Sequence, residues 1–313
     1  MKRLVSSSAR GGANQIPGLP KSRGSPKKHA VSRTKPRNSL FFMTHEGQYD
    51  NMNAFFRTNG YDEVFSQEDY PADKVVNSFG VQDDFLYDYA IPVLNQRAAT
   101  GQPFFATLLS ISNHPPYVIP PFFHPKTSEP EMQIVEYADW ALRQFFEEAR
   151  KQPWFDNTIF VLEGDHGKLV GDAECELPES YNHIPLMIYS SRIQPEEKTA
   201  FGGQVDIQPT ILGLLNIDYL QNNFGVDLLK EERPCMFYTA DNMVVGRNDT
   251  LLYLYNYETQ QELTYDIGNG KLNAVPMDDS FLPLKEYSFS MLQSAEFLVK
   301  HGKTLNSIPF TQQ

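Results

Sequence analysis

Residues 154–167 read WFDNTIFVLEGDHG and indicate the fold of this chain. A turn at Asp156-Asn157 leads into residues 158–162, a short apolar run that is rich in β-branched and aromatic side chains. Such a run predicts a buried strand of a parallel sheet. The strand ends in Gly-Asp-His-Gly, so a carboxylate and an imidazole stand at its carboxyl end. In open α/β sheets, ligands bind at that edge.

Asp165 and His166 are the first candidate metal ligands. A carboxylate and an imidazole together suit Mn²⁺ or Zn²⁺, and the flanking Gly164 and Gly167 allow backbone and ligand to approach closely. The alternative is a turn at the strand end, with Asp165 capping a helix. The tripeptide alone does not separate these two interpretations, so other segments must decide between them.

Charge is distributed unevenly along the 313 residues. Residues 1–37 hold ten Lys and Arg and no acid, whereas the rest of the chain holds 17 basic and 39 acidic side chains. We expect residues 1–38, which are rich in Ser, Gly, Pro, Lys and Arg, to be a disordered head or the remnant of a truncation. A basic tail that binds nucleic acid or an anionic membrane is the alternative. The acidic body argues against nucleic acid as the main partner.

Cysteine content and hydropathy exclude several classes of protein. Cys175 and Cys235 are too few for a disulfide framework and lack the spacing of metal ligands. The sequence has no run of about 18 apolar residues that could span a bilayer. Its N-terminus has no apolar segment of the kind found in a secretory signal. A 41% hydrophobic content fits a globular protein with one large core or two modest ones.

The rest of the chain alternates between strand-like and helix-like patterns. Apolar runs predict strands at 40–44, 61–66, 103–110, 184–189 and 234–238, and an antiparallel hairpin at 250–257 and 262–266. Helical periodicity or helix-start signals predict helices at 51–56, 82–98, 133–150, 206–215 and 287–300. The fold class is therefore α/β, with a mostly parallel central sheet flanked by helices and a small C-terminal antiparallel sheet.

Three more histidines lie at the ends of predicted strands. His45 follows the first strand, His114 follows the strand at 103–110, and His183 precedes the strand at 184–189. We expect these side chains to share the ligand-binding edge with Asp165 and His166. For His45, a capped or solvated side chain is an equally good explanation.

Five segments together resemble one protein family. They are FFMTHEGQYDNM (41–52), FFATLLSISNHPPY (104–117), WFDNTIFVLEGDHG (154–167), NHIPLMIY (182–189) and GGQVDIQPTILGLL (202–215). In this order they are similar to the extracytoplasmic domain of lipoteichoic acid synthase-like proteins. Those proteins are phosphoglycerol transferases in the sulfatase branch of the alkaline phosphatase superfamily. The resemblance covers about residues 39–300.

The resemblance implies one divalent metal, usually manganese, with zinc or magnesium as alternatives. Asp165 and His166 match the metal ligands of the family, and His114 matches the histidine that contacts the phosphate or the leaving group. His45 falls near a further histidine of the family site, and His183 lies where related enzymes sometimes place one. By resemblance, the substrate is a lipid head group or another phosphate or sulfate ester at the membrane surface, and the domain faces the periplasm or the cell exterior.

Two departures from the family pattern change the expectation. The aromatic-Asn-Arg motif that helps to bind the head group is replaced by Gln48-Tyr49-Asp50-Asn51, which contains no Arg. The strand ending in a metal-binding Glu and the nucleophilic Thr should precede residue 39, where only the basic head is found. We therefore expect an N-terminally truncated member that lacks its membrane helices and is impaired in catalysis. A catalytically inactive binding domain is the alternative.

The predicted domain organisation follows from these matches. Residues 1–38 form the head, residues 39–235 the sulfatase-like catalytic core, and residues 236–313 the hairpin and helix that complete the domain.

Overall fold

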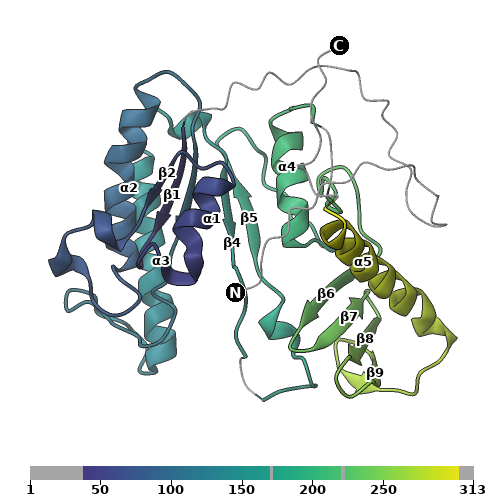
Figure 1. Cartoon of the computed structure of the whole chain (residues 1–313). Coiled ribbons are helices and arrows are strands. Elements are labelled where there is room, and N and C mark those ends of the chain that lie inside the picture. The colour runs from purple at the N-terminus through teal and green to yellow at the C-terminus, as the bar shows by residue number, and fades with distance from the viewer. Residues whose placement is uncertain (1–37, 170–171, 220–222, 303–313) are drawn as a thin grey trace, which may run out of the picture. The chain divides into compact units, whose positions relative to one another are not determined.

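A computed structural model describes residues 38–169, 172–219 and 223–302 (Figure 1). The predicted head, residues 1–38, lies outside the described residues except for Asn38. The chain divides into two compact units. Of the described residues, the N-terminal unit holds 38–161 and 187–194, and the C-terminal unit holds 162–186 and 195–302.

The N-terminal unit is built on a parallel sheet in the order β2-β1-β3. Its strands are β1 (Ser39–Met43), β2 (Glu63–Phe65) and β3 (Phe105–Leu109). Its helices are α1 (Met52–Thr58), α2 (Asp83–Ala98) and α3 (Pro130–Ala149). In register, Phe41 of β1 lies beside Val64 of β2 and Thr107 of β3.

Alternation along β1 gives this sheet two covered faces. Leu40 and Phe42 pack with α2, and the same core holds Phe145 of α3. Phe41 and Met43 belong to a separate core with residues of α1 on the opposite face (Figure 1). A strand that is buried on both faces has a continuous apolar run, which is why 40–44 was recognisable in the sequence.

Two strands connect the units along the chain. β4 (Phe160–Glu163) pairs with β5 (Leu186–Tyr189), and both cross from one unit to the other. The C-terminal unit continues with α4 (Ile207–Leu214). A five-stranded antiparallel sheet follows, in the order β10-β9-β8-β7-β6. Its strands are β6 (Met236–Ala240), β7 (Met243–Arg247), β8 (Leu251–Asn256), β9 (Gln261–Asp266) and β10 (Asn273–Ala274).

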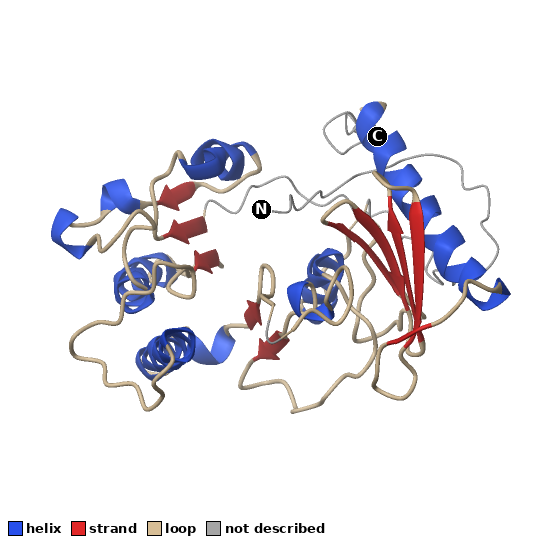
Figure 2. Ribbon diagram, turned by 90° about the horizontal axis from the view of Figure 1, so that it is seen from below, coloured by secondary structure: helices blue, strands red, loops and turns tan. Residues whose placement is uncertain are grey.

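Helix α5 (Leu282–Lys300) lies across one face of the antiparallel sheet (Figure 2). On β8, Tyr253 packs with Leu284 of α5, whereas Leu252 and Leu254 pack on the opposite face with Leu177. Gly246 of β7 allows the close approach, because a Cβ there would lie 2.6 Å from Ser288 Oγ. The buried Ser288 hydroxyl donates to Leu284 O at 2.8 Å.

The predicted fold class is confirmed, and most predicted elements are present with shifted ends. The helix expected from residue 287 begins at Leu282, with Pro283 in its first turn, a position that suits proline. Strands β7 and β10 were not predicted. The predicted division at residues 39 and 235 stays a prediction. No helix in the described ranges combines the length and apolar character that crossing a bilayer requires.

Candidate functional site

The Asp165–His166 pair follows β4 in the C-terminal unit. Asp165 Oδ1 accepts the His166 N–H at 3.0 Å, and Asp165 Oδ2 lies 3.8 Å from His166 Nε2. His166 Nδ1 lies 2.8 Å from Gly167 O. Because a carbonyl oxygen only accepts, Nδ1 carries the proton in this contact. In the neutral ring, the lone pair of Nε2 then lies on the side of the carboxylate, as metal ligation requires.

Hydrogen bonds on both sides hold this edge in place. Gly167 N donates to Tyr181 O at 2.9 Å, and Gly164 N donates to Pro185 O at 3.4 Å. The segment that carries His183 therefore runs alongside the Asp-His pair. A Cβ at Gly167 would lie 1.8 Å from Ser180 O, so this close approach requires glycine at position 167.

Gln204, just before α4, supports the same edge from another element. Its Nε2 donates to Gly164 O at 3.2 Å and to Asp165 O at 3.0 Å. The start of α4 is itself fixed by a buried ion pair between Asp206 and Arg233, which meet at 2.5 Å. Asp206 also accepts the Gly203 N–H at 2.8 Å, which ties the segment before α4 to the same carboxylate.

The antiparallel sheet anchors the loop that leads to His183. Glu179 forms an ion pair with Arg247 of β7, whose guanidinium lies 5.1 Å from the centre of the Phe201 ring. Tyr265 of β9 donates to Glu176 Oε2 at 2.5 Å. Leu177, between these two acids, is buried against the sheet. The C-terminal sheet thus orders a segment that borders the candidate metal ligands.

Glu163 precedes the pair at the end of β4. Partial burial, together with the negative charge of Asp165, raises the pKa of this carboxyl. A second negative charge next to Asp165 is therefore disfavoured at this edge.

The donor set fits a divalent cation in part. Asp165 and His166 supply an oxygen and a nitrogen donor 3.8 Å apart, the chemistry that Mn²⁺ or Zn²⁺ accepts. Tetrahedral catalytic sites normally use three protein ligands. In the described parts of the chain, no three side chains of His, Cys, Asp and Glu come together as a metal cluster.

The N-terminal unit holds the other two predicted histidines at the carboxyl ends of β1 and β3. His45 is 1% exposed, and its Nδ1 lies 3.1 Å from Glu46 O. The His45 ring packs on Tyr49 at 4.7 Å, Tyr49 faces Phe79 at 6.1 Å, and Phe79 packs on His114 at 4.2 Å between ring centres. The structure thus joins His45 and His114 through a row of four rings.

The backbone that follows Tyr49 adopts an unusual conformation. Asp50 and Asn51 have φ angles of 47° and 57°, the left-handed region that residues other than glycine seldom occupy. Such outliers cluster at functional sites. Their position here coincides with the segment in which the sequence departs from the family motif.

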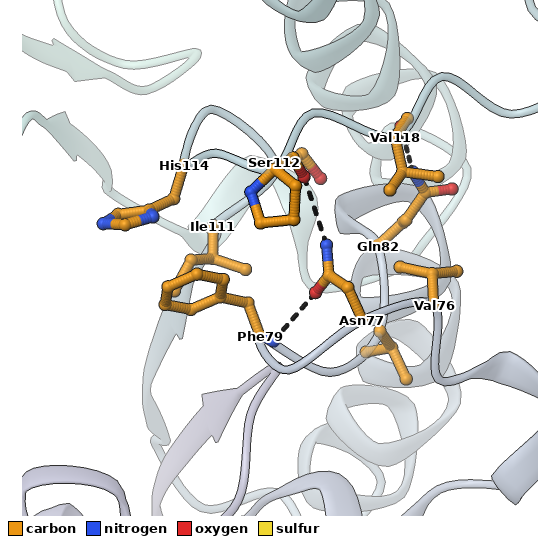
Figure 3. A pocket seen from close by; sticks show the side chains of 10 residues that line it. Val76, Asn77, Phe79, Gln82, Ile111, Ser112, His114 and Val118 are labelled. Atoms are coloured by element: carbon orange, nitrogen blue, oxygen red, sulfur yellow. Dashed lines mark hydrogen bonds between the residues drawn. The ribbon is translucent and has the colours of Figure 1, made fainter.

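A shallow recess beside His114 lies between two loops of the N-terminal unit (Figure 3). Its lining is mostly apolar and includes Val76, Phe79, Ile111 and Val118. The His114 ring stands at one side of it, exposed, with Nδ1 at 3.0 Å from Pro115 O. As with His166, a neutral ring that carries its proton on Nδ1 has Nε2 available.

The sequence-predicted residues therefore form two groups, each within one unit. Asp165, His166 and His183 lie on adjoining segments of the C-terminal unit, and His45 and His114 belong to the ring row of the N-terminal unit. Their roles stay predictions. For His45, burial excludes the solvated alternative. The capped alternative stays open, because its ring nitrogen Nδ1 contacts the carbonyl oxygen of Glu46.

Sequence reasoning missed the residues that hold these groups in place. Gln204 and Phe79 carry no motif of their own, because their partners are a backbone carbonyl and a ring from distant segments. For Gln204, a usable signal existed: it lies in the quoted segment 202–215, just ahead of a predicted helix start.

Comparison with solved structures defines the class of protein first. A protein in the alkaline phosphatase superfamily from Vibrio parahaemolyticus superimposes with a TM-score of 0.74 at 25% identity, covering 87% of this chain and 67% of that one. The lipoteichoic acid synthase LtaP from Listeria monocytogenes shares the fold, with a TM-score of 0.71 at 22% identity and coverage of 88% and 71%. The fold is that of the alkaline phosphatase superfamily.

Residues 33–217, more than half of the chain, match the Sulfatase family model, so the chain belongs to the sulfatase family. Lipoteichoic acid synthase 1 of Bacillus subtilis is 26% identical over 243 residues, which are 71% of this chain and 36% of the relative. Lipoteichoic acid synthase of Staphylococcus aureus (strain USA300) is 24% identical over 213 residues, 58% and 31% of the two chains. The predicted resemblance is confirmed. The chain spans about a third of the length of these relatives.

Proposed function

We propose that this chain carries the core of an enzyme that hydrolyses or transfers phosphate or sulfate esters, with lipid head-group phosphoglycerol transfer outside the membrane as its reaction. The Asp165–His166 pair carries this proposal, because an oxygen and a nitrogen donor 3.8 Å apart stand at the ligand-binding edge of a sulfatase-family fold. The relatives named above support the phosphoglycerol class.

Asp165 and His166 would hold one divalent cation, for which manganese is our first expectation. When bound, such a cation supplies positive charge that stabilises a phosphate or sulfate group as negative charge develops on it. The Gly167 carbonyl accepts a hydrogen bond from His166 Nδ1, which orients the imidazole so that Nε2 would be free to bind the cation. His183 is proposed to contact the ester group from the adjoining segment.

His114 and His45 are proposed to act on the ester as well. In its protonated form, His114 can donate a proton from Nε2 to a departing alcohol while Nδ1 stays bound to Pro115 O. The buried His45 ring packs on Tyr49, a residue that is 43% exposed, so His45 is proposed to act on the ester beside Tyr49.

Calorimetric titration with manganese tests the metal site. We expect wild-type protein to bind Mn²⁺, and Asp165→Ala and His166→Ala to lose most of this binding. His301→Ala is the matched control, because His301 is also exposed and its Nδ1 also contacts a backbone carbonyl, that of Phe297. Equal binding by the wild type and both site variants would sink the proposal.

A second candidate function is a binding domain without turnover. It is favoured by the lack of a third metal ligand near the pair in the described residues, because a two-ligand site binds metal weakly. We propose for the same reason that this chain alone is impaired as a catalyst. Manganese-dependent turnover of p-nitrophenyl phosphate by the purified chain, lost in His114→Ala, would refute the binding-domain function.

A further inference from the structure

Asp83, the first residue of α2, is buried at 2% exposure. Its Oδ1 accepts the N–H groups of Ile111 at 2.9 Å and of Ser112 at 3.0 Å. In return, the Asp83 N–H donates to Ser112 Oγ at 3.1 Å. These bonds fix the backbone just after β3, two residues before His114.

This carboxylate serves the loop rather than its own helix. Acidic residues at a helix start commonly cap free N–H groups of the first turn. The residue before α2 forms no side-chain cap bond, and the Asp83 carboxylate accepts from the loop after β3. Its neighbour Asp84 instead accepts from the Tyr137 hydroxyl of α3 at 2.6 Å.

The residues just before α2 hold the other side of His114. Asn77 Nδ2 donates to Pro116 O at 3.3 Å, and Gln82 Nε2 donates to Val118 O at 2.5 Å (Figure 3). The Phe79 ring lies against the imidazole at 4.2 Å. His114 therefore stands between two bonded stretches, 111–112 and 116–118, and both are held by residues 77–83.

The alternative is that Asp83 only stabilises the fold. Burial of a carboxylate is costly, and burial raises the pKa of Asp83 although the Ile111 and Ser112 N–H groups oppose that shift. An apolar residue at the helix start would avoid this cost. A buried acid that accepts two consecutive N–H groups of the His114 loop is instead explained if the conformation of that loop must be fixed.

We propose that Asp83 is a positioning residue for His114. Its carboxylate fixes the 111–112 backbone so that the imidazole rests on Phe79 with Nδ1 bound to Pro115 O and Nε2 free. The catalytic meaning of this placement rests on the proposed function, but the placement is measured on the protein without metal or substrate, so the two can fail separately.

Nuclear magnetic resonance of the histidine ring reports this placement. In the wild type we expect an upfield ring-current shift of the His114 carbon-bound protons and ¹⁵N shifts of a ring protonated on Nδ1. Asp83→Ala should move both signals toward those of the exposed His124. Asp83→Asn keeps a side-chain oxygen that accepts both N–H groups, so it should restore the wild-type signals. Asp84→Asn, the matched control, should leave them unchanged.

Coincident His114 signals in folded Asp83→Ala and in the wild type would overturn the proposal, as would an Asp83→Asn protein that behaves like Asp83→Ala. If Asp83→Ala does not fold, hydrogen exchange of backbone amides in the wild type tests the proposal instead. The Ile111 and Ser112 amides should exchange at least tenfold more slowly than the amide of Asn113. Exchange of all three at the same rate would contradict the proposal.

Discussion

His45 and His166 each follow a strand of this fold, yet their surroundings differ. The His45 side chain is buried among rings of the N-terminal unit, whereas the His166 side chain is 64% exposed and lies beside a carboxylate that is 74% exposed. Both rings are oriented in the same way, because Nδ1 of each contacts the carbonyl of the next residue. In both groups, the orientation of the imidazole ring is therefore set by a contact with the next residue in the chain.

What differs is how the supporting backbone is fixed. In the N-terminal unit, the buried Asp83 holds the loop after β3 directly. In the C-terminal unit, the buried Asp206–Arg233 pair fixes the start of α4, and Gln204 then reaches the Asp165 carbonyl. Each group thus combines an exposed histidine, His114 or His166, with a buried acid that helps to fix the supporting backbone. The comparison predicts larger stability effects at the buried charges than at the exposed residues.

Removal of Arg233 tests the strongest part of this comparison. Arg233→Met would leave the Asp206 carboxylate buried without its ion-pair partner, so we expect a loss of about 3–5 kcal/mol in the free energy of unfolding. Urea denaturation measures it. Lys230→Met is the control, because the Lys230 side chain is 65% exposed where it pairs with Asp227, and its loss should change stability far less. Equal losses of stability in the two variants would show that the Asp206–Arg233 pair contributes no more to the fold than an exposed pair.

A methyl group at Gly167 tests the close approach in the C-terminal unit. Gly167→Ala should cost about 1–3 kcal/mol, because its Cβ would collide with Ser180 O and push the two segments apart. It should also weaken manganese binding in the calorimetric titration. Gly164→Ala is the matched control in the same loop, since the nearest atoms to its Cβ belong to the Ile184 side chain, at 3.3 Å. If Gly167→Ala binds manganese like the wild type, the metal site does not depend on the close approach of residue 167 to Ser180.

The pH dependence of stability tests the buried carboxylate of the N-terminal unit. Burial, assisted by the charge of Asp84, raises the pKa of Asp83 above its unfolded value near 3.8. The stability contributed by the protonated group is therefore fully present below pH 3.8 and is lost as pH rises through the folded pKa. The free energy of unfolding of the wild type minus that of Asp83→Asn should fall between these two pKa values, by about 1.4 kcal/mol for each pH unit that separates them. A difference that rises with pH would mean that the hydrogen bonds outweigh burial.

Replacement of Gln204 by leucine has the smallest expected effect on stability. Gln204→Leu removes the donor to the Gly164 and Asp165 carbonyls, so we expect a loss of about 0.5–1.5 kcal/mol and a modest decrease in manganese affinity. Gln208→Leu is the control, because its amide contacts the side chain of Asn223 instead. If both variants bind manganese like the wild type, the edge is held without Gln204.

Several features of the fold could be predicted from local patterns. The buried strand at 40–44 and the amphipathic helix at 133–150 were found because burial on both faces, or on one helical stripe, leaves a readable period in the sequence. The strand β7 was missed, although its residues 243–246 are all buried. It has Gly246 near its end, and the packing of Ser288 on that glycine becomes visible only in three dimensions.

The sequence by itself determined that Asp165 and His166 are adjacent at a strand end, because neighbours in the chain stay neighbours in the fold. Only the tertiary structure decided which distant groups support them. The row of rings from His45 to His114 and the bond from Asp83 to the loop after β3 join segments that are tens of residues apart. Such contacts arise from packing and hydrogen-bond satisfaction between elements, which leave no period or spacing in a single sequence.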